Sequence, residues 1–192
     1  MWEAVDAIRS TGELDHDGRR LLALAAEKLR IASLDPGPVP ADEFQVPTRS
    51  PCPYCENFAG RFAPHGPPAV ITEDDVTFVF LAPAPMGGMP GHSLVATRRH
   101  VETIFDLTAA EGTALGLAVV AAAQAVRAAF APAGVLIQQN NGVAAFQTVP
   151  HVHFHVIPKV PGPFPPAQPP EPMPYEERAK LAKRLSRHWP LG

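Results

Sequence analysis

The sequence predicts one α+β domain in the middle of the chain, with an extension on either side. Strand-like runs surround one long run of helix-forming residues, and 192 residues with 46% hydrophobic content suit a single core. Prolines, which favour loops because they cannot donate a backbone hydrogen bond, cluster on both sides. Six lie between Pro36 and Pro53, and eight between Pro161 and Pro174. The expected units are an N-terminal helical extension with a proline-rich linker (1–49), the domain (50–160), and a proline-rich C-terminal segment (161–192).

The central domain holds four stretches with strand character. Each combines β-branched or aromatic residues with alternation, and glycine, proline or asparagine bounds most of them. The first is expected to contain two strands around an acidic turn. The stretches are Val70–Leu81, with its turn at Glu73-Asp74-Asp75, then Gly91–Thr97, Val135–Gln139 and Gln147–Pro158.

The longest expected helix runs from Thr108 to Phe130. Thr108 and Glu111 have the spacing of a capping box, and nearly all the residues that follow are good helix formers. Pro132 and Gly134 are expected to end it. The extensions are expected to contain shorter helices: an amphipathic one over 18–33, another near Trp2–Ile8, and a basic one over Tyr175–Trp189 with a solvated face.

Composition excludes several classes of protein. A net charge of -3 gives no basic footprint for nucleic acid. The N-terminus has neither the basic nor the apolar region of a signal peptide, and the apolar stretch Leu115–Ala123 falls short of the ~20 residues that a membrane span needs. We therefore expect a cytoplasmic protein that binds no membrane. In that compartment Cys52 and Cys55 are expected to be metal ligands or redox groups, not a structural disulfide.

Three histidines at alternate positions are the most informative pattern. His151, His153 and His155 would project from one face of a strand, while the apolar residues between them point into a core. A row of imidazoles on one face is costly unless each ring has a partner. The pattern indicates either a metal-binding strand or a nucleophilic site.

The surroundings of the triad favour an anionic ligand. Carboxylates are absent between Glu111 and Glu171, and the residues upstream of the triad are neutral hydrogen-bonding groups or glycine. Such a site suits a phosphoryl group, which requires positioning and charge stabilisation. A neutral imidazole nitrogen can attack phosphorus and divide one difficult displacement into two steps. The neutral residues are Asn140, Gly142, Gln147 and Thr148.

Several ordered motifs resemble the histidine triad (HIT) family, in particular its zinc-containing bacterial members. The stretch His151–Ile157 has three histidine–apolar pairs followed by an apolar residue, which is the family signature. The resemblance covers roughly Cys52 to Pro158. Its other elements are Asn140-Asn141-Gly142, Gln147-Thr148-Val149, Glu73-Asp74-Asp75, Pro90-Gly91-His92-Ser93-Leu94-Val95 and Arg99-His100.

The resemblance implies a five-stranded antiparallel sheet with a long helix packed on it, usually in a homodimer. It implies that His153 is the nucleophile, forming a nucleotidyl-histidine intermediate, and that His155 orients and polarises the site. A histidine at 155 resembles the hydrolase branches, because the related uridylyltransferases carry glutamine there. The implied groups that hold the phosphate and leaving group are Asn140, Gly142, Gln147 and Thr148, with His92 as a nearby pocket histidine.

This chain departs from the family pattern at two positions. Ala82 stands where an acidic or amide residue often grips the ribose, and Phe146 stands where glycine usually precedes the glutamine. The loop before His92 is lengthened by Met86–Met89. The expected substrate is a nucleoside phosphoramidate or dinucleoside polyphosphate. The departures leave two alternatives: a noncatalytic nucleotide-binding sensor, or an enzyme recruited to an unusual biosynthetic phosphoryl substrate.

The motif Cys52-Pro53-Tyr54-Cys55 has two interpretations. Its sequence equals a glutaredoxin active site, but no buried strand precedes it and prolines and glycines leave no room for a long helix after it. Structural zinc fits better, because two cysteines and two histidines form a common tetrahedral site. The resemblance implies the ligand set Cys52, Cys55, His100 and His151. A third possibility is a metalloenzyme whose ligands are the three triad histidines.

Overall fold

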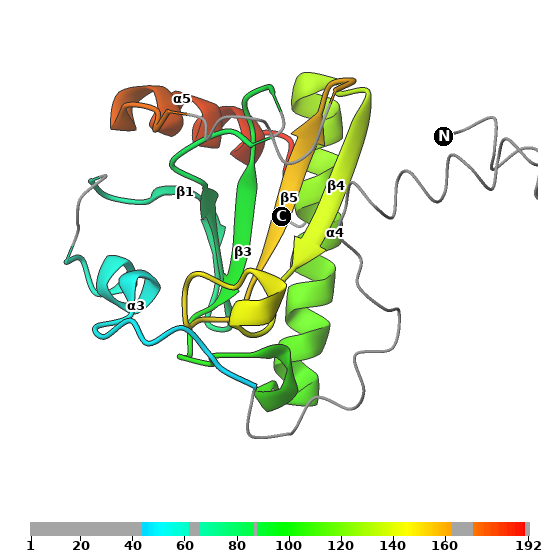
Figure 1. The fold of residues 1–192 in the computed structure, drawn as a ribbon. Coiled ribbons are helices and arrows are strands. Elements are labelled where there is room, and N and C mark those ends of the chain that lie inside the picture. The colour runs from blue at the N-terminus through cyan, green and yellow to red at the C-terminus, as the bar shows by residue number, and fades with distance from the viewer. Residues whose placement is uncertain (1–43, 62–65, 87, 163–170, 191–192) are drawn as a thin grey trace, which may run out of the picture. The chain divides into compact units, whose positions relative to one another are not determined.

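The computed structural model describes residues 44–61, 66–86, 88–162 and 171–190. Five strands form one antiparallel sheet in the order β1-β2-β3-β5-β4, which confirms the predicted architecture (Figure 1). The helices expected within residues 1–33 lie outside the described residues. The strands are β1 (Ala69–Glu73), β2 (Thr77–Leu81), β3 (Ser93–Thr97), β4 (Gly134–Gln139) and β5 (His153–Lys159).

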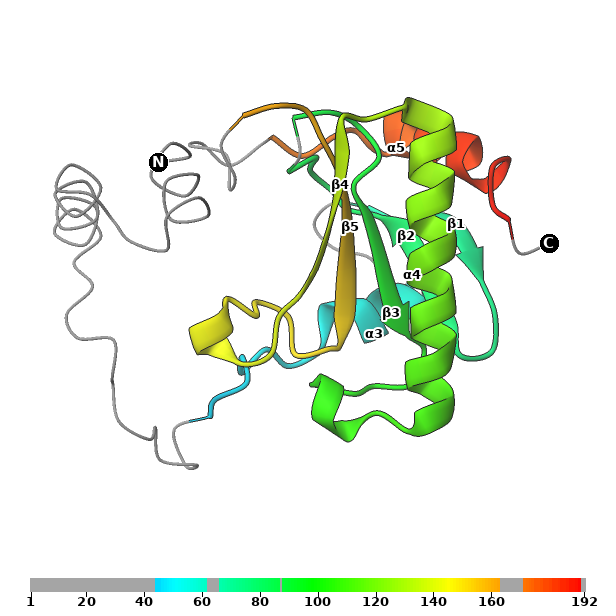
Figure 2. The ribbon, with the colours of Figure 1, turned by 90° about the vertical axis from the view of Figure 1, so that its right-hand side faces the viewer.

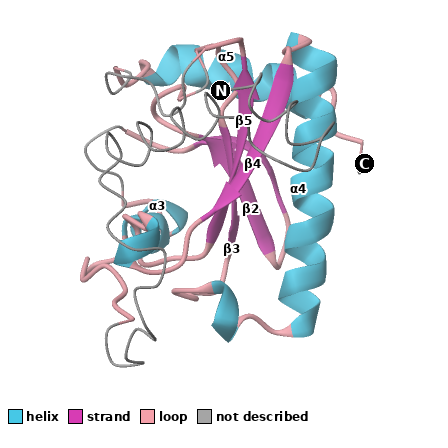
Figure 3. Ribbon diagram, turned by 45° about the vertical axis from the view of Figure 1, so that its right-hand side comes forward, coloured by secondary structure: helices cyan, strands magenta, loops and turns pink. Residues whose placement is uncertain are grey.

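Helices cover both faces of the sheet. The long helix α4 and the C-terminal helix α5 pack on one face, and the short helix α3 lies over the other (Figure 3). The first face buries aliphatic side chains such as Val79, Val95 and Val156 against α4. The second buries aromatic side chains, including Phe78 and Phe80. The helices are α3 (Pro53–Phe58), α4 (Ala109–Phe130) and α5 (Tyr175–Ser186), with 3-10 turns η2 (Ile104–Asp106) and η3 (Val143–Ala145).

Helix α4 begins and ends where the sequence predicts. The Glu111 backbone N–H donates to Thr108 Oγ1 at 3.2 Å, and the Thr108 N–H donates to Glu111 Oε2 at 2.9 Å, which completes the capping box. With 22 residues, this helix is long and apolar enough to cross a membrane, judged by length and composition alone. The apolar stretch is therefore longer than the predicted Leu115–Ala123. In this structure its buried side chains, among them Leu115 and Val126, pack on the sheet instead.

Helix α5 is less solvated than its composition indicates. Ala182 and Leu185 are buried in the core shared with α4, and Arg178 is buried with its Nε donating to the Met173 carbonyl at 3.2 Å. Figure 2 shows α5 near the end of α4, beside β1 and β2. The interpretation as a solvated face therefore holds only for its exposed basic side.

Strand β5 begins later than predicted. The sequence predicts a strand from Gln147, but the described strand starts at His153. Pro150 has no N–H for a strand ladder, and the His151 N–H donates to the Val149 carbonyl at 2.8 Å, which turns the chain. In β5, His153 pairs with Ala96 and His155 with Leu94 on the face under α3, whereas Val156 enters the α4 core.

Candidate active site and metal centre

Two cysteines and two histidines from distant parts of the chain converge on one point. Cys52 precedes helix α3, Cys55 lies within it, His100 follows β3 and His151 precedes β5. The His151 Nδ1 lies 3.6 Å from each sulfur, and the His100 Nδ1 lies 3.3 Å from the Cys55 sulfur. The four donor atoms all lie within 4.8 Å of one another. All four residues that the family resemblance implies as metal ligands are close enough to bind one ion.

The fit to a tetrahedral ion is good. Zinc–sulfur and zinc–nitrogen bonds of ~2.3 and ~2.0 Å place neighbouring ligands about 3.5 Å apart, and the three sulfur–nitrogen distances given above agree with this spacing. His151 is also held in the tautomer that a metal requires. Its Nε2–H donates to the Thr97 carbonyl at 2.8 Å, which leaves the lone pair on Nδ1, facing the sulfurs.

The Cys55 thiol does not have the character of a reactive thiolate. Burial and the neighbouring Cys52 raise the pKa of the Cys55 thiol to about 11, whereas a reactive cysteine has a lowered pKa. Helix α3 has only six residues, so its dipole gives little help. A divalent cation would lower the pKa of the thiols, because its charge stabilises the thiolates. The donor set therefore fits a metal.

His153 is buried and presents one nitrogen for chemistry. Its side chain is 4% exposed, and its Nδ1–H donates to the carbonyl of His151 at 2.7 Å. Since a carbonyl only accepts, the proton of the neutral ring must lie on Nδ1 and the lone pair on Nε2. Burial lowers the pKa of His153, so the imidazole is neutral. The same His151 that converges with the cysteines thus orients the His153 ring.

A second chain of hydrogen bonds determines the tautomers of two more histidines. His92 Nδ1–H donates to the Ala84 carbonyl at 3.1 Å, so its Nε2 is an acceptor. His155 Nδ1–H donates to that Nε2 at 3.0 Å, which leaves a lone pair on His155 Nε2. Burial, with the nearby His153 adding to it, lowers the pKa of His92 to about 4 and that of His155 to about 3. The ring of His155 lies 4.8 Å from that of His153, centroid to centroid.

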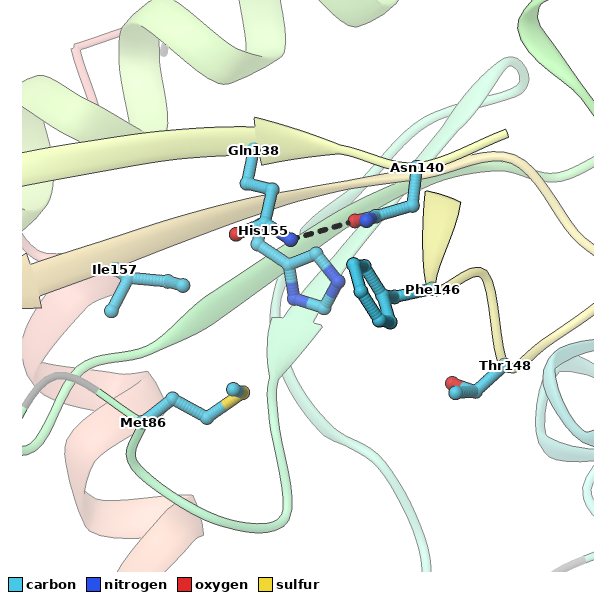
Figure 4. Close-up of a pocket in the computed structure, with 7 residues that line it drawn as sticks. All are labelled: Met86, Gln138, Asn140, Phe146, Thr148, His155 and Ile157. Carbon is cyan, nitrogen blue, oxygen red and sulfur yellow. Dashed lines mark hydrogen bonds between the residues drawn. The ribbon is translucent and has the colours of Figure 1, made fainter. Parts of the chain in front are cut away.

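A cavity of about 540 Å³ opens beside His155. Figure 4 shows Phe146 and Met86 on either side of the His155 imidazole, with Thr148 beyond the phenyl ring. Gln138 Nε2 donates to Asn140 Oδ1 at 2.9 Å at one wall. None of the seven lining residues carries a formal charge when His155 is neutral. They are Met86, Gln138, Asn140, Phe146, Thr148, His155 and Ile157.

Gln147 and Gly142 lie in the loop between β4 and β5 and are not among the residues that line this cavity. Gln147 is buried, and its Oε1 accepts from the Gly142 N–H at 2.7 Å. Its Nε2 donates to the carbonyls of Glu102 at 2.7 Å and Val149 at 3.0 Å. Gly142 has φ of 80°, and a side chain there would meet Phe44 at 3.0 Å. These two residues brace the loop between β4 and β5.

The structure therefore separates the expected site residues into three groups. His92, His153 and His155 form one cluster, Asn140 and Thr148 line the cavity, and Gln147 and Gly142 brace the loop. The functional roles expected of these residues stay predictions. Ala82 is buried in the aromatic core and lies outside the cavity lining.

Sequence reasoning missed three residues of the site. Ile157 follows His155 at the strand period, and Gln138 precedes Asn140 by two residues, so alternation could have identified both. Tyr54 packs edge-on against His153 at 5.1 Å and lies 5.7 Å from His151. No local signal marks it, since its partners are almost a hundred residues away.

Comparison with known proteins gives one consistent result. The family model of the HIT domain matches residues 64–162. The chain is 40% identical over 88 residues to a bis(5'-nucleosyl)-tetraphosphatase of Schizosaccharomyces pombe, covering 46% of each protein. It is 34% identical over 108 residues to the adenosine 5'-monophosphoramidase hnt1 of the same yeast, covering 56% of this chain and 74% of hnt1.

A solved structure agrees with these relatives. The Zn-bound histidine triad family protein of Mycobacterium smegmatis superposes with a TM-score of 0.57 at 28% identity, covering 71% of this chain and 94% of that one. The family match spans more than half of the chain, and the sheet, the long helix and the histidine cluster all agree with it. The chain belongs to the HIT family.

Proposed function

We propose that this protein is a nucleotide-type phosphohydrolase or nucleotidyl transferase that acts through a covalent intermediate on His153. The observation that carries the proposal is the His153 Nδ1–H bond to the His151 carbonyl, which leaves a buried, neutral Nε2 as the nucleophile. The proposed substrates are nucleoside phosphoramidates or dinucleoside polyphosphates. Similarity to a phosphoramidase and to a dinucleoside tetraphosphatase supports this class.

The proposed reaction has two displacements at phosphorus. The His153 Nε2 lone pair forms a bond to phosphorus while the bond to the leaving group breaks, and the leaving group takes a proton from solvent. The Nδ1–H of the charged imidazole stays bonded to the His151 carbonyl, which stabilises the intermediate. Water then attacks the phosphorus, the P–N bond breaks, and its electron pair returns to Nε2. The unprotonated His155 Nε2 accepts the proton of that water before releasing it to solvent.

Zinc is the proposed metal of the four-residue centre. Cys52, Cys55, His100 and His151 would hold it, with the Thr97 carbonyl fixing the orientation of His151. Four protein ligands leave no open position, so zinc would supply structural support and no bound water. Because the His151 carbonyl also orients His153, the metal centre would brace the nucleophile.

A homodimer is part of the proposal. Leu117 and Val120 on α4 and Ile137 on the edge strand β4 are large apolar side chains left exposed in the chain alone. A second copy of the chain would cover them. Sedimentation of the protein measures its mass directly, and a purely monomeric species at micromolar concentration would contradict this part.

Turnover of a substrate panel tests the proposed activity. We expect the purified protein to hydrolyse at least one nucleoside phosphoramidate or dinucleoside polyphosphate, and His153→Asn to abolish turnover while leaving nucleotide binding and the fold intact. A wild-type protein that binds nucleotides but turns over none of the panel would favour the sensor function. Residual activity of His153→Asn within about tenfold of wild type would contradict a covalent role for His153.

A further inference from the structure

Phe146 has a backbone conformation that does not suit its residue type. Its φ of 63° and ψ of 25° lie in the left-handed region, which is sterically costly for any residue with a Cβ atom. Among the described residues, Ala131 is the other non-glycine residue with a positive φ, and it ends helix α4 as Phe146 ends the 3-10 turn η3. Glycine would be the easier residue at 146, so a phenyl ring there needs a separate reason.

Packing against the residues that the structure describes does not supply that reason. The Phe146 side chain is 84% exposed, so its burial contributes little to stability. The ring instead forms one wall of the cavity beside His155 (Figure 4). A strained backbone that holds an exposed aromatic ring against a reaction site indicates a role in ligand binding.

The other walls of the cavity favour the same kind of ligand. Met86 lies across the His155 imidazole from Phe146, and Ile157 adds a third apolar side chain. Aromatic rings stack on a phenyl face or meet it edge-on, and thioether sulfurs also attract aromatic rings. A volume of about 540 Å³ is in the range of small-molecule sites. The cavity is therefore suited to an aromatic group.

We infer that Phe146 is a specificity-determining residue that, with Met86, receives an aromatic ring of the substrate close to the reacting phosphorus. The inference rests on the proposed function, since it assumes a phosphoryl group held at His153. The aromatic ring of the substrate is placed near the phosphorus because the cavity adjoins His155. The imidazole centroid of His155 lies 4.8 Å from that of His153, where the phosphoryl group would be held. Its source is either the leaving group or the nucleoside base, and both share this chemistry.

Equilibrium binding of three simple phosphonates tests the inference without requiring turnover. Phenylphosphonate carries a planar ring, cyclohexylphosphonate a similar apolar volume that is not planar, and methylphosphonate neither. We expect calorimetry to show that wild type binds the phenyl compound about tenfold more tightly than the methyl compound, and more tightly than the cyclohexyl compound. Phe146→Gly should lose most of the preference for the phenyl compound, because Met86 and Ile157 remain as the apolar walls. Phe146→Leu should keep the preference for cyclohexyl over methyl but lose the preference for phenyl over cyclohexyl.

Ala131→Gly is the matched control, because it also replaces a left-handed residue by glycine but lies at the end of α4. It should keep the wild-type order of affinities. The inference is overturned if wild type shows no preference for the phenyl compound, or if Phe146→Gly keeps that preference. Because no chemistry is involved, a loss of ring preference is distinguishable from a failure of the covalent mechanism.

A second pair of ligands identifies the source of the ring. If the cavity takes the base, AMP should bind more tightly than ribose 5-phosphate, and Phe146→Gly should remove most of that difference. If it takes the leaving group, Phe146→Gly should leave the AMP to ribose 5-phosphate ratio unchanged while still removing most of the phenylphosphonate preference. Either result supports a ring-binding role for Phe146.

Discussion

At the scale of single residues, two carbonyl oxygens determine the chemistry of the histidine cluster. The His151 carbonyl fixes the proton of His153 on Nδ1, and the Ala84 carbonyl does the same for His155 through His92. Neither arrangement needs a charged residue. The lone pairs on His153 Nε2 and His155 Nε2 follow from backbone acceptors and from burial, which lowers the pKa of both rings.

The lowered pKa values of His92 and His155 predict a loss of stability in acid. An unfolded histidine binds a proton below about pH 6.5, whereas these two stay neutral in the fold until about pH 4 and 3. Between these values the unfolded state binds more protons, so stability present at pH 7 falls as the pH falls. We expect the free energy of unfolding to drop by about 2 kcal/mol per histidine from pH 7 to 5.

Chemical denaturation at pH 7 and pH 5 measures this loss, and carboxylates interfere little because they titrate mainly below this range. The double variant His92→Asn, His155→Asn should lose less stability than wild type over the same interval. Equal losses of stability in the two proteins would show that the pKa values of His92 and His155 are not lowered in the folded protein.

Glycine at either left-handed position should stabilise the protein. We expect Phe146→Gly and Ala131→Gly each to raise the free energy of unfolding by about 1 kcal/mol, the net of relieved strain of ~1–2 and an entropic cost of ~0.5–1 kcal/mol. Urea denaturation of both variants checks this. A stabilised Ala131→Gly beside a destabilised Phe146→Gly would mean that the Phe146 ring packs against the fold more than its exposure indicates.

At the scale of elements, the loop between β4 and β5 connects the metal centre to the cavity. Val143 N–H donates to the Gln45 carbonyl at 2.8 Å, and Val152 N–H donates to the Val101 carbonyl at 2.6 Å. Gln147 joins three backbone groups inside the loop. Cavity residues and the first histidine of the triad therefore depend on the same braced segment.

Replacing Gln147 distinguishes a bracing role from a substrate contact. Gln147→Ala leaves the Gly142 N–H and the carbonyls of Glu102 and Val149 without their partner, so we expect a loss of about 2 kcal/mol in unfolding free energy. Thr148→Ala, at an exposed neighbour in the cavity lining, should change stability by less than about 0.5 kcal/mol. A Gln147→Ala protein as stable as wild type would mean that the glutamine serves the substrate alone.

At the scale of the whole molecule, sequence patterns predicted the architecture better than the contacts within the site. Alternation and the capping box are local, so the five strands and α4 were predictable. The start of β5 was not, because the turn at Pro150 competes with the alternation that continues through it. The burial of Ala182 and Leu185 in α5 was hidden by the basic residues between them.

The sequence predicted the four residues of the metal centre, but it did not predict all the residues of the cavity or the hydrogen bonds of the site. The four metal-site residues converge as the motifs imply. The carbonyls of Ala84 and Thr97, the ring of Tyr54 and the orientation of Gln147 are contacts that depend on the folded loops. A backbone carbonyl is present at every position, so no sequence motif marks which one accepts a given proton.

The metal centre joins α3, the end of β3 and the start of β5, so its occupancy should affect the stability of the whole molecule. We expect purified protein to hold about one zinc per chain, and chelation to lower the melting temperature by about 5 °C or more, because metal binding contributes folding free energy. Cys52→Ser and Cys55→Ser should lose the metal, whereas the control His155→Gln should keep it. Metal-free protein of unchanged stability would contradict the structural role, and zinc retained by both cysteine variants would point to the triad histidines as ligands.

The most direct test of the account is detection of the covalent intermediate. Wild-type protein mixed with a nucleoside phosphoramidate that it turns over, quenched within a single turnover and digested, should yield a peptide heavier by one nucleotidyl group. Fragmentation by mass spectrometry should place that group on His153, and His153→Asn should show neither the adduct nor turnover. Turnover without any adduct on His153, together with a His153→Asn rate within about tenfold of wild type, would contradict the account.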